Sequence, residues 1–528
     1  MPRIAPAAVA ACALLAAAHA AAQADDACAS LQSFTAAGAG VEITAAERVG
    51  EGSAASGGTG GGGGGGAGGA GAAVLPAHCR IEGVIERRTG VGGVEYGIKF
   101  ALALPDDWNG RFLFQGGGGL NGTVRAPVGA QAAGGEPALA RGFAVVSTDS
   151  GHEGAGFDGS FFADQEATLN FLYAAIGKVT PVAKQLVAAR YGRQADHSYF
   201  VGCSTGGREG MIMSQRYPTF FDGVVAGAPA MRTGYSNLGM RWVSVSLAQA
   251  AAEDERGERI PGTALSSGDR SLIVDALLEQ CDALDGVADG MIFDVAGCGF
   301  DPRELTCPAA KTDQCLTGDQ VAAVARAMSG AKASNGRQVY SRYLYDAGIG
   351  ASGPGTLPGV LSGAASPVDG PTPPTAQDVD AEAAAAANEP SALGNSHTWT
   401  NLSTFSSNGG KLLFYHGNSD PWFSAVDTLE YYERLAHASG GLDAARDFSR
   451  LFLVPGMGHC AGGGAALDRF DLLSAVVEWV EHGVAPDAVL ATGNAFPGRS
   501  RPLCAYPQHA HYTGAGDTED AANFECRP

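Results

Sequence analysis

Short apolar runs alternate with helix-like stretches in two separate parts of this 528-residue chain. The strand-like runs of the first part lie at residues 97–104, 111–115, 142–149 and 198–201. Residues 167–191 have helical periodicity. After residue 395 the pattern resumes, with strands predicted at 411–417 and 449–454 and helices at 424–438 and 468–482. Strands that alternate with helices pair side by side in parallel, so the pattern predicts an α/β fold.

The segment between these two parts lacks the pattern. Residues 230–395 carry four cysteines, an acidic loop and a stretch at 348–387 that is rich in Pro, Gly and Ala. We interpret this segment as a lid domain, inserted into a core that comprises residues 25–229 and 396–528. A chain of this length is ample for two domains.

The chain begins with the pattern of an export signal. Arg3 precedes an Ala- and Leu-rich run at 7–18, and small residues typical of a cleavage site follow. This run is too short to span a membrane, and no later stretch reaches about 18 consecutive apolar residues. We expect residues 1–24 to be a signal peptide and the mature chain to be secreted or periplasmic. The glycine-rich residues 50–71 predict a flexible surface loop.

The net charge and the cysteine content argue against some classes of partner and of metal or redox site. The formal net charge of −21 argues against nucleic acid or an anionic membrane as a partner. One of the eleven cysteines, Cys12, lies in the presumed signal, and the even number that remains favours disulfides in an exported chain. There is no Cys-x-x-Cys pair, which disfavours a zinc or redox site.

Residues 202–207, GCSTGG, form the most informative motif. They follow the apolar run 198–201 and precede the helix-like stretch 208–217. A serine between glycines at a strand-to-helix turn is typical of the nucleophile elbow of an α/β-hydrolase, in which Ser204 would be the nucleophile. Because the chain contains 78 glycines, a chance occurrence of the pentapeptide is the alternative.

An acyl-transfer serine needs a base and a carboxylate that orients the base. Asp420 and His459 each follow a predicted strand, and they come after Ser204 in the order that α/β-hydrolases have. The alternatives are that Asp420 caps the following helix and that His459 is solvated. Cys203 precedes the serine and Cys460 follows the histidine, so an assembled triad would bring them together as a disulfide. Two unrelated thiols are the alternative.

Backbone N–H groups are needed to stabilise the oxyanion of the intermediate. We predict that one belongs to Thr205, the residue after the nucleophile. The other is predicted in the glycine turn 116–119, where we choose Gly118. A plain tight turn is the alternative for these glycines.

The strings GCSTGGRE, FDGVVAGAPA, YHGNSDP and VPGMGHC resemble those of the tannase and feruloyl esterase family, and the likeness runs over about residues 28–526. The resemblance implies an α/β-hydrolase core with a lid. It implies activity on esters of aromatic acids, such as hydroxycinnamates, gallates or terephthalate half-esters. It also implies the disulfides Cys203–Cys460, Cys28–Cys79, Cys281–Cys298, Cys307–Cys315 and Cys504–Cys526.

The acidic loop 281–291 has three carboxylates around a glycine turn, which suits a hard cation with oxygen ligands. The resemblance implies a structural calcium ion in this part of the lid. Its implied ligands are the side chains of Asp282, Asp285 and Asp289 and the carbonyls of Val287 and Met291. A solvated acidic loop is the alternative.

Together these features predict a serine carboxylesterase acting on a small aromatic ester. The alternatives are a terephthalate half-ester hydrolase, an amidase or peptidase, and a non-catalytic binding protein on the same fold. Aromatic and cationic side chains of the lid are candidate substrate contacts, namely Trp242, Tyr340, Tyr343, Tyr345, Trp399 and Arg342. For the aromatic ones, a place in the core of the lid is the default.

Overall fold

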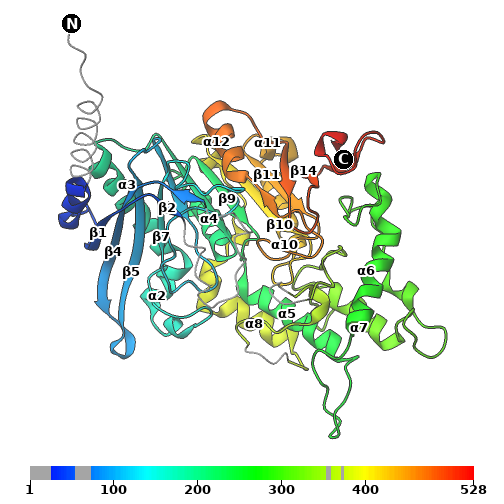
Figure 1. Cartoon of the computed structure of the whole chain (residues 1–528). Coiled ribbons are helices and arrows are strands. Elements are labelled where there is room, and N and C mark those ends of the chain that lie inside the picture. The colour runs from blue at the N-terminus through cyan, green and yellow to red at the C-terminus, as the bar shows by residue number, and fades with distance from the viewer. Residues whose placement is uncertain (1–24, 54–72, 353–357, 370–373) are drawn as a thin grey trace.

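The computed structural model describes residues 25–53, 73–352, 358–369 and 374–528. The predicted signal peptide and most of the glycine-rich segment therefore lie outside the described residues. Nine strands form one mixed sheet in the order β1-β4-β5-β7-β6-β8-β9-β10-β11 (Figure 1). Their bounds are β1 (Val41–Val49), β4 (His78–Thr89), β5 (Glu95–Pro105), β6 (Arg111–Gln115), β7 (Ala144–Thr148), β8 (His197–Cys203), β9 (Gly223–Gly227), β10 (Lys411–Gly417) and β11 (Ser449–Val454).

The register of the parallel strands brings their carboxyl ends to one edge of the sheet. Strands β1, β4, β5 and β7 pair antiparallel, whereas β7, β6, β8, β9, β10 and β11 run parallel. Cys203 is paired with Gly227, Gly227 with Tyr415, and Gly417 with Val454. Ligands of open α/β sheets bind beyond the carboxyl ends of the strands, so this edge is where a site is expected.

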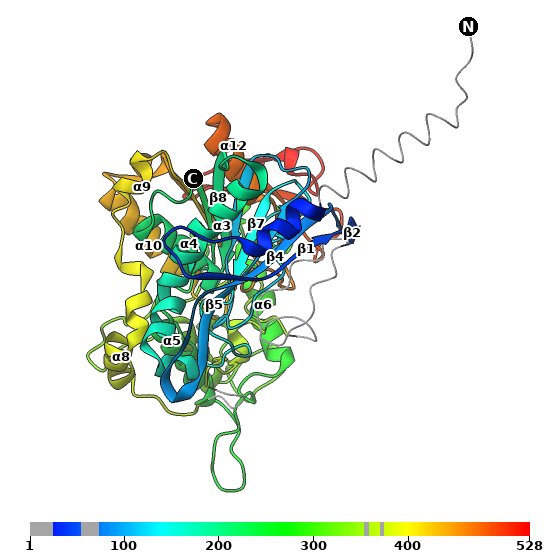
Figure 2. The ribbon, with the colours of Figure 1, turned by 90° about the vertical axis from the view of Figure 1, so that its left-hand side faces the viewer.

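Helices cover both faces of the sheet, which explains why the strands read as nearly continuous apolar runs. Phe112 and Phe114 of β6 pack with α3, α4 and α10 on one face, and Leu113 packs with α12 on the other. Figure 2 shows α3 and α4 beside the strands. The core helices are α2 (Gln165–Leu169), α3 (Ala175–Tyr191), α4 (Thr205–Arg216), α10 (Ala425–Ala438), α11 (Leu442–Arg446) and α12 (Leu472–His482).

The predicted elements of the core are present, with two shifts. The helix predicted at 167–191 is divided, because a π-helical segment, Asn170–Ala174, separates α2 from α3. The last predicted helix begins at Leu472 rather than at residue 468, since the side chain of Asp471 accepts a hydrogen bond from the Ser474 amide and caps it. The predicted α/β-hydrolase core is confirmed.

Helices joined by long irregular connections form the segment between β9 and β10, which lies at one end of the sheet (Figure 1). Its helices are α5 (Thr233–Ala248), α6 (Ser267–Cys281), α7 (Gly318–Met328), α8 (Val379–Asn388) and α9 (Ser403–Ser407). Helices α5, α6 and α7 pack around a hydrophobic core of their own, which includes Leu238, Leu277 and Val324. The exact limits of the lid, 230–395, stay a prediction.

Three small sheets complete the described chain. They contain β2 (Gly52–Ser53) with β3 (Val74–Leu75), β12 (Arg469–Phe470) with β13 (Ala488–Thr492) and β14 (Ser500–Cys504), and β15 (His509–Tyr512) with β16 (Phe524–Arg527).

All five predicted disulfides are formed, namely Cys28–Cys79, Cys203–Cys460, Cys281–Cys298, Cys307–Cys315 and Cys504–Cys526. Within the described ranges, no helix has both the length and the apolar character needed to cross a bilayer.

Candidate active site

Ser204 lies at the turn between β8 and α4. Its backbone adopts φ 66° and ψ −122°, a conformation that residues with a side chain rarely take. A Cβ atom on Gly206 or Gly207 would collide with the carbonyl oxygens of Gly117 and Gly227, so glycine is required for α4 to begin this close to the neighbouring strands. The turn therefore has the geometry of a nucleophile elbow.

Asp420 and His459 form a buried pair beyond β10 and β11. His459 Nδ1 lies 2.7 Å from Asp420 Oδ2. The other carboxylate oxygen, Oδ1, accepts hydrogen bonds from the amides of Trp422 and Phe423 at 2.8 and 3.0 Å. Helix α10 is capped by Ser424, so capping that helix is not the role of Asp420. One oxygen of the aspartate is thus held by the backbone while the other orients the imidazole.

A second histidine contacts the same carboxylate. His416 Nε2 lies 3.2 Å from Asp420 Oδ2, and its Nδ1 lies 2.8 Å from Thr428 Oγ1. Burial acts to raise the pKa of Asp420, but attraction to His459 and hydrogen bonds from His416 and His459 outweigh burial and hold this pKa well below its ordinary value. Sequence reasoning missed His416, although it precedes the aspartate in the YHGNSDP string.

The Cys203–Cys460 disulfide joins the serine turn to the histidine loop. The two Cα atoms are 5.9 Å apart, although the cysteines are 257 residues apart in the sequence. Ser204 is 8% exposed, and His459 Nε2 is a buried atom with no hydrogen-bond partner in the described part of the chain. The elbow, the imidazole and the carboxylate are therefore gathered at one edge of the sheet, with a ring nitrogen available for a proton.

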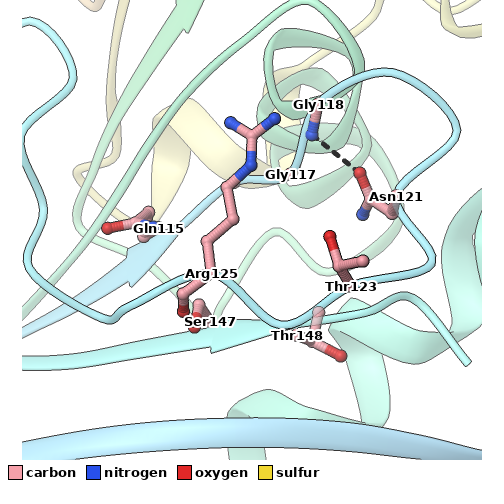
Figure 3. Close-up of a pocket in the computed structure, with 9 residues that line it drawn as sticks. Gln115, Gly117, Gly118, Asn121, Thr123, Arg125, Ser147 and Thr148 are labelled. Atoms are coloured by element: carbon pink, nitrogen blue, oxygen red, sulfur yellow. Dashed lines mark hydrogen bonds between the residues drawn. The ribbon is translucent and has the colours of Figure 1, made fainter. Parts of the chain in front are cut away.

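The glycine turn after β6 corrects one predicted residue. The amide of Gly118 donates a hydrogen bond to Asn121 Oδ1 at 2.7 Å (Figure 3), so it is not free for an oxyanion. The amides of Gly119 and Thr205 have no acceptor among the described residues, and the Gly119 carbonyl accepts a hydrogen bond from the Thr205 hydroxyl. The available pair is Thr205 with Gly119 rather than Gly118. Four consecutive glycines look alike in a sequence, so the register was not predictable.

Aromatic rings from core loops surround the imidazole. The ring centroids of Trp422 and Phe423 lie 4.7 and 5.0 Å from that of His459. Phe157 packs edge-on against Trp422, with centroids 6.1 Å apart. All three aromatic side chains are half-buried, so each leaves part of its surface open to a ligand. Sequence reasoning missed them because they lie in loops without periodicity.

Four of the candidate aromatic side chains of the lid pack in its hydrophobic core or against it, namely Trp242, Tyr340, Tyr343 and Tyr345. Trp399 is 59% exposed, and Arg342 is also exposed. The aromatic surface next to the imidazole therefore comes from the core loops.

The acidic loop lies where α6 ends, with Asp282 and Asp285 buried. Asp282 accepts hydrogen bonds from the amides of Gly290 and Met291, and Asp289 forms an ion pair with the buried Arg501. Within the described ranges, no three His, Cys, Asp or Glu side chains are arranged to hold a metal ion.

The donor chemistry of this loop nevertheless fits a hard cation. Burial, with repulsion from the carboxylates of Asp289 and Asp282, raises the pKa of Asp285 to about 7. A cluster of buried carboxylates is costly unless a cation compensates their charge, and the ion pairs of Arg501 and Arg499 with this loop are made to Asp289. Calcium binding through the side chains of this loop and the carbonyls of Val287 and Met291 stays a prediction.

Comparisons with known proteins agree with this geometry. A model of the family described as tannase and feruloyl esterase matches residues 79–356 and 376–527. The mono(2-hydroxyethyl) terephthalate hydrolase of Piscinibacter sakaiensis is 41% identical over 521 residues, covering 86% of this chain and 85% of that protein. Feruloyl esterase B of Aspergillus niger is 32% identical over 450 residues, covering 80% of this chain and 82% of that protein.

A comparison with a solved structure supports the same fold assignment. The crystal structure of feruloyl esterase B from Aspergillus oryzae matches with a TM-score of 0.75 and 28% identity, covering 96% of this chain and all of that one. The family match takes in both parts of the core and much of the segment between them. This chain therefore belongs to the tannase and feruloyl esterase family and is a carboxylic ester hydrolase.

Proposed function

We propose that this chain is an exported serine esterase that hydrolyses esters of aromatic acids through an acyl-enzyme. The observation that carries the proposal is the buried Asp420–His459 pair, tied to the Ser204 turn by the Cys203–Cys460 disulfide. Export is supported by the five disulfides, which persist in oxidising compartments, and by the signal-like residues 1–24.

The reaction follows from the roles of these groups. Ser204 Oγ attacks the ester carbonyl while His459 Nε2 takes its proton, and Asp420 stabilises the imidazolium that forms. The amides of Thr205 and Gly119 donate to the negatively charged oxygen of the tetrahedral intermediate. His459 then gives the proton to the leaving alcohol, and water attacks the acyl-enzyme by the same route in reverse.

The aromatic nature of the acyl group is supported by the rings at the imidazole. Trp422, Phe423 and Phe157 offer flat apolar surface beside His459, and aromatic rings pack favourably on such surface. Hydroxycinnamate and gallate esters are the first candidates, as the family's description implies. A terephthalate half-ester is the second candidate, because a relative with that substrate in its name is 41% identical.

A panel of substrates tests this proposal. We expect turnover of methyl ferulate or methyl gallate, with mono(2-hydroxyethyl) terephthalate as the second arm and an anilide as the amidase arm. Ser204→Ala should lower kcat by at least about 10³-fold, whereas the control Ser214→Ala, a buried serine on the same helix, should stay active.

Three outcomes contradict the proposal. Full activity of Ser204→Ala would refute the serine mechanism. Faster turnover of the anilide than of every ester would favour an amidase. Absence of turnover, with no fluorophosphonate label on Ser204, would favour a binding protein.

For the acidic loop we propose a structural calcium ion, held by Asp282, Asp285, Asp289 and the carbonyls of Val287 and Met291. These ligands are not members of the triad, so the ion would stabilise the lid without entering the reaction.

A further inference from the structure

We propose that Glu209 and Asn121 form a positioning pair that fixes the glycine turn so that the Gly119 amide faces the substrate. The inference rests on the proposed function, because it concerns the donors that stabilise the oxyanion. Glu209 and Asn121 have no role in the mechanism given above, and they touch no reacting atom.

Glu209 is a carboxylate buried in the first turns of α4. It is 1% exposed. Its Oε2 accepts a hydrogen bond from the amide of Gly117 at 2.8 Å, and its Oε1 accepts from Asn121 Nδ2 at 3.2 Å and from Ser150 Oγ at 3.4 Å. A buried carboxylate is costly unless donors satisfy it, and here the donors come from the glycine turn and its supporting loop. The helix that begins at Ser204 therefore also holds this turn.

Asn121 links the carboxylate to the next glycine. Its Oδ1 accepts a hydrogen bond from the Gly118 amide at 2.7 Å (Figure 3). Its Nδ2 donates to Glu209 and to Ser150. Its backbone has φ 51°, a left-handed conformation that asparagine tolerates better than most residues. The carboxylate of Glu209 thus only accepts hydrogen bonds. The side-chain amide of Asn121 accepts through its oxygen and donates through its nitrogen.

These hydrogen bonds determine which amide of the glycine turn is available to the oxyanion. The amides of Gly117 and Gly118 donate to Glu209 and Asn121, whereas the amide of Gly119 meets no acceptor within the described ranges. The Gly117 carbonyl accepts from the Gly206 amide at 3.1 Å, which fixes the turn against α4. An oxyanion donor must point at the developing charge, so a small rotation of this turn would weaken catalysis more than substrate binding.

Exchanging the carboxylate and the amide between positions 209 and 121 tests the pair. Glu209→Gln places an NH₂ group against the NH₂ group of Asn121, and Asn121→Asp places two carboxylates together. We expect each single variant to lower kcat by about 10²-fold, with KM within about threefold of wild type. In the double variant Glu209→Gln/Asn121→Asp, the new carboxylate accepts from Gly118 and from the new amide, whose oxygen accepts from Gly117. We expect kcat to recover at least about tenfold over either single variant.

Two further readouts separate positioning from stability. A trifluoromethyl ketone forms a negatively charged adduct with the serine, so its inhibition constant should weaken in the single variants in proportion to kcat, while that of the free product acid should not. The control Glu481→Gln removes a carboxylate that accepts hydrogen bonds from Arg111 and Tyr199, near the amino ends of β6 and β8. It should lower the melting temperature and leave kcat unchanged.

The outcomes are distinguishable. An unchanged kcat in Glu209→Gln, with Ser204→Ala inactive, would overturn the positioning role alone, as would a folded double variant without recovery. An active Ser204→Ala would overturn the proposed function itself. If the double variant does not fold, Ser150→Ala removes one donor to Glu209 and is expected to lower kcat several-fold. An unchanged kcat in that variant would overturn the inference.

Discussion

Four groups contact the carboxylate of Asp420, two at each oxygen. Two backbone amides hold Oδ1, while His459 and His416 share Oδ2. The lowered pKa of Asp420 favours its ionised form. The imidazole of His459 is therefore oriented by a carboxylate that is itself held by backbone amides.

Asp420→Asn tests this at the scale of one residue. An amide in place of the carboxylate removes the charge and favours the wrong imidazole tautomer, so we expect kcat to fall by about 10³–10⁴-fold with little change in KM. Steady-state kinetics with methyl ferulate measure this. The control Asp427→Asn, on α10, breaks an ion pair with Arg232 at the start of α5, and it should lower stability while kcat stays within about threefold. A kcat near wild type in Asp420→Asn would refute the orienting role.

Residues that follow predicted strands were the predictable part of the site. Ser204, Asp420 and His459 each lie beyond a strand whose apolar run is visible in the sequence. Gly119 was not predictable, because its availability depends on hydrogen bonds of its neighbours to Asn121 and Glu209. Sequence periodicity does not report such contacts between distant side chains.

At the scale of elements, the loops after β8 and β11 depend on their disulfide. Closing a loop of 257 residues stabilises a fold by about 5.5 kcal/mol in the chain-entropy model. The same model gives about 2.5 kcal/mol for Cys307–Cys315, whose cysteines are 8 residues apart. The first bond also ties the turn of Ser204 to the loop of His459.

The double variant Cys203→Ala/Cys460→Ala should lose activity at temperatures well below its global unfolding, because the histidine loop is released first. Activity and circular dichroism measured together over a temperature series check this. The control Cys307→Ala/Cys315→Ala should lose activity only when it unfolds. Wild-type activity in the first variant would show that the bond is dispensable.

Asp346 joins the segment between β9 and β10 to the loops of Asp420 and His459. Its Oδ2 accepts from Ser419 Oγ at 2.6 Å and from the Gly456 amide at 2.7 Å, and these residues belong to the loops of Asp420 and His459. Burial raises its pKa to about 6. The raised value means that the folded state favours the protonated form, so its contribution to stability is complete below about pH 4 and is lost as pH rises through 6.

Asp346→Asn should remove this pH dependence. Relative to the variant, the wild type should lose about 2 kcal/mol of its free energy of unfolding between pH 4 and pH 7, an upper figure for a shift of this size. Urea denaturation at several pH values measures the difference. Parallel pH profiles of the two proteins would contradict the assignment.

At the scale of the whole molecule, the core was predictable, whereas the individual contacts that hold the lid were not. The apolar runs predicted the parallel strands because each run is a local feature of the sequence. The lid is held by contacts between distant segments, such as the bidentate pair of Arg232 with Asp427 and the bonds of Asp346. Such contacts leave no periodic signal in the sequence.

Calcium removal is a test at this scale. If the acidic loop binds calcium, a chelator should lower the melting temperature by several degrees while the initial rate at modest temperature changes little. Thermal denaturation with EGTA, and again after added calcium or magnesium, measures the effect. No shift with EGTA would count against the ion, and recovery with magnesium alone would count against calcium.

The bond between residues 203 and 460 also encloses the entire inserted segment. A protease that cuts within this segment leaves two polypeptides that remain covalently connected across the reactive centre. Such a nicked protein would migrate as one species until a thiol is added. New chain termini, or an insert exchanged from a related enzyme, are therefore best introduced within the inserted segment, because the disulfide keeps the two parts of the core covalently joined.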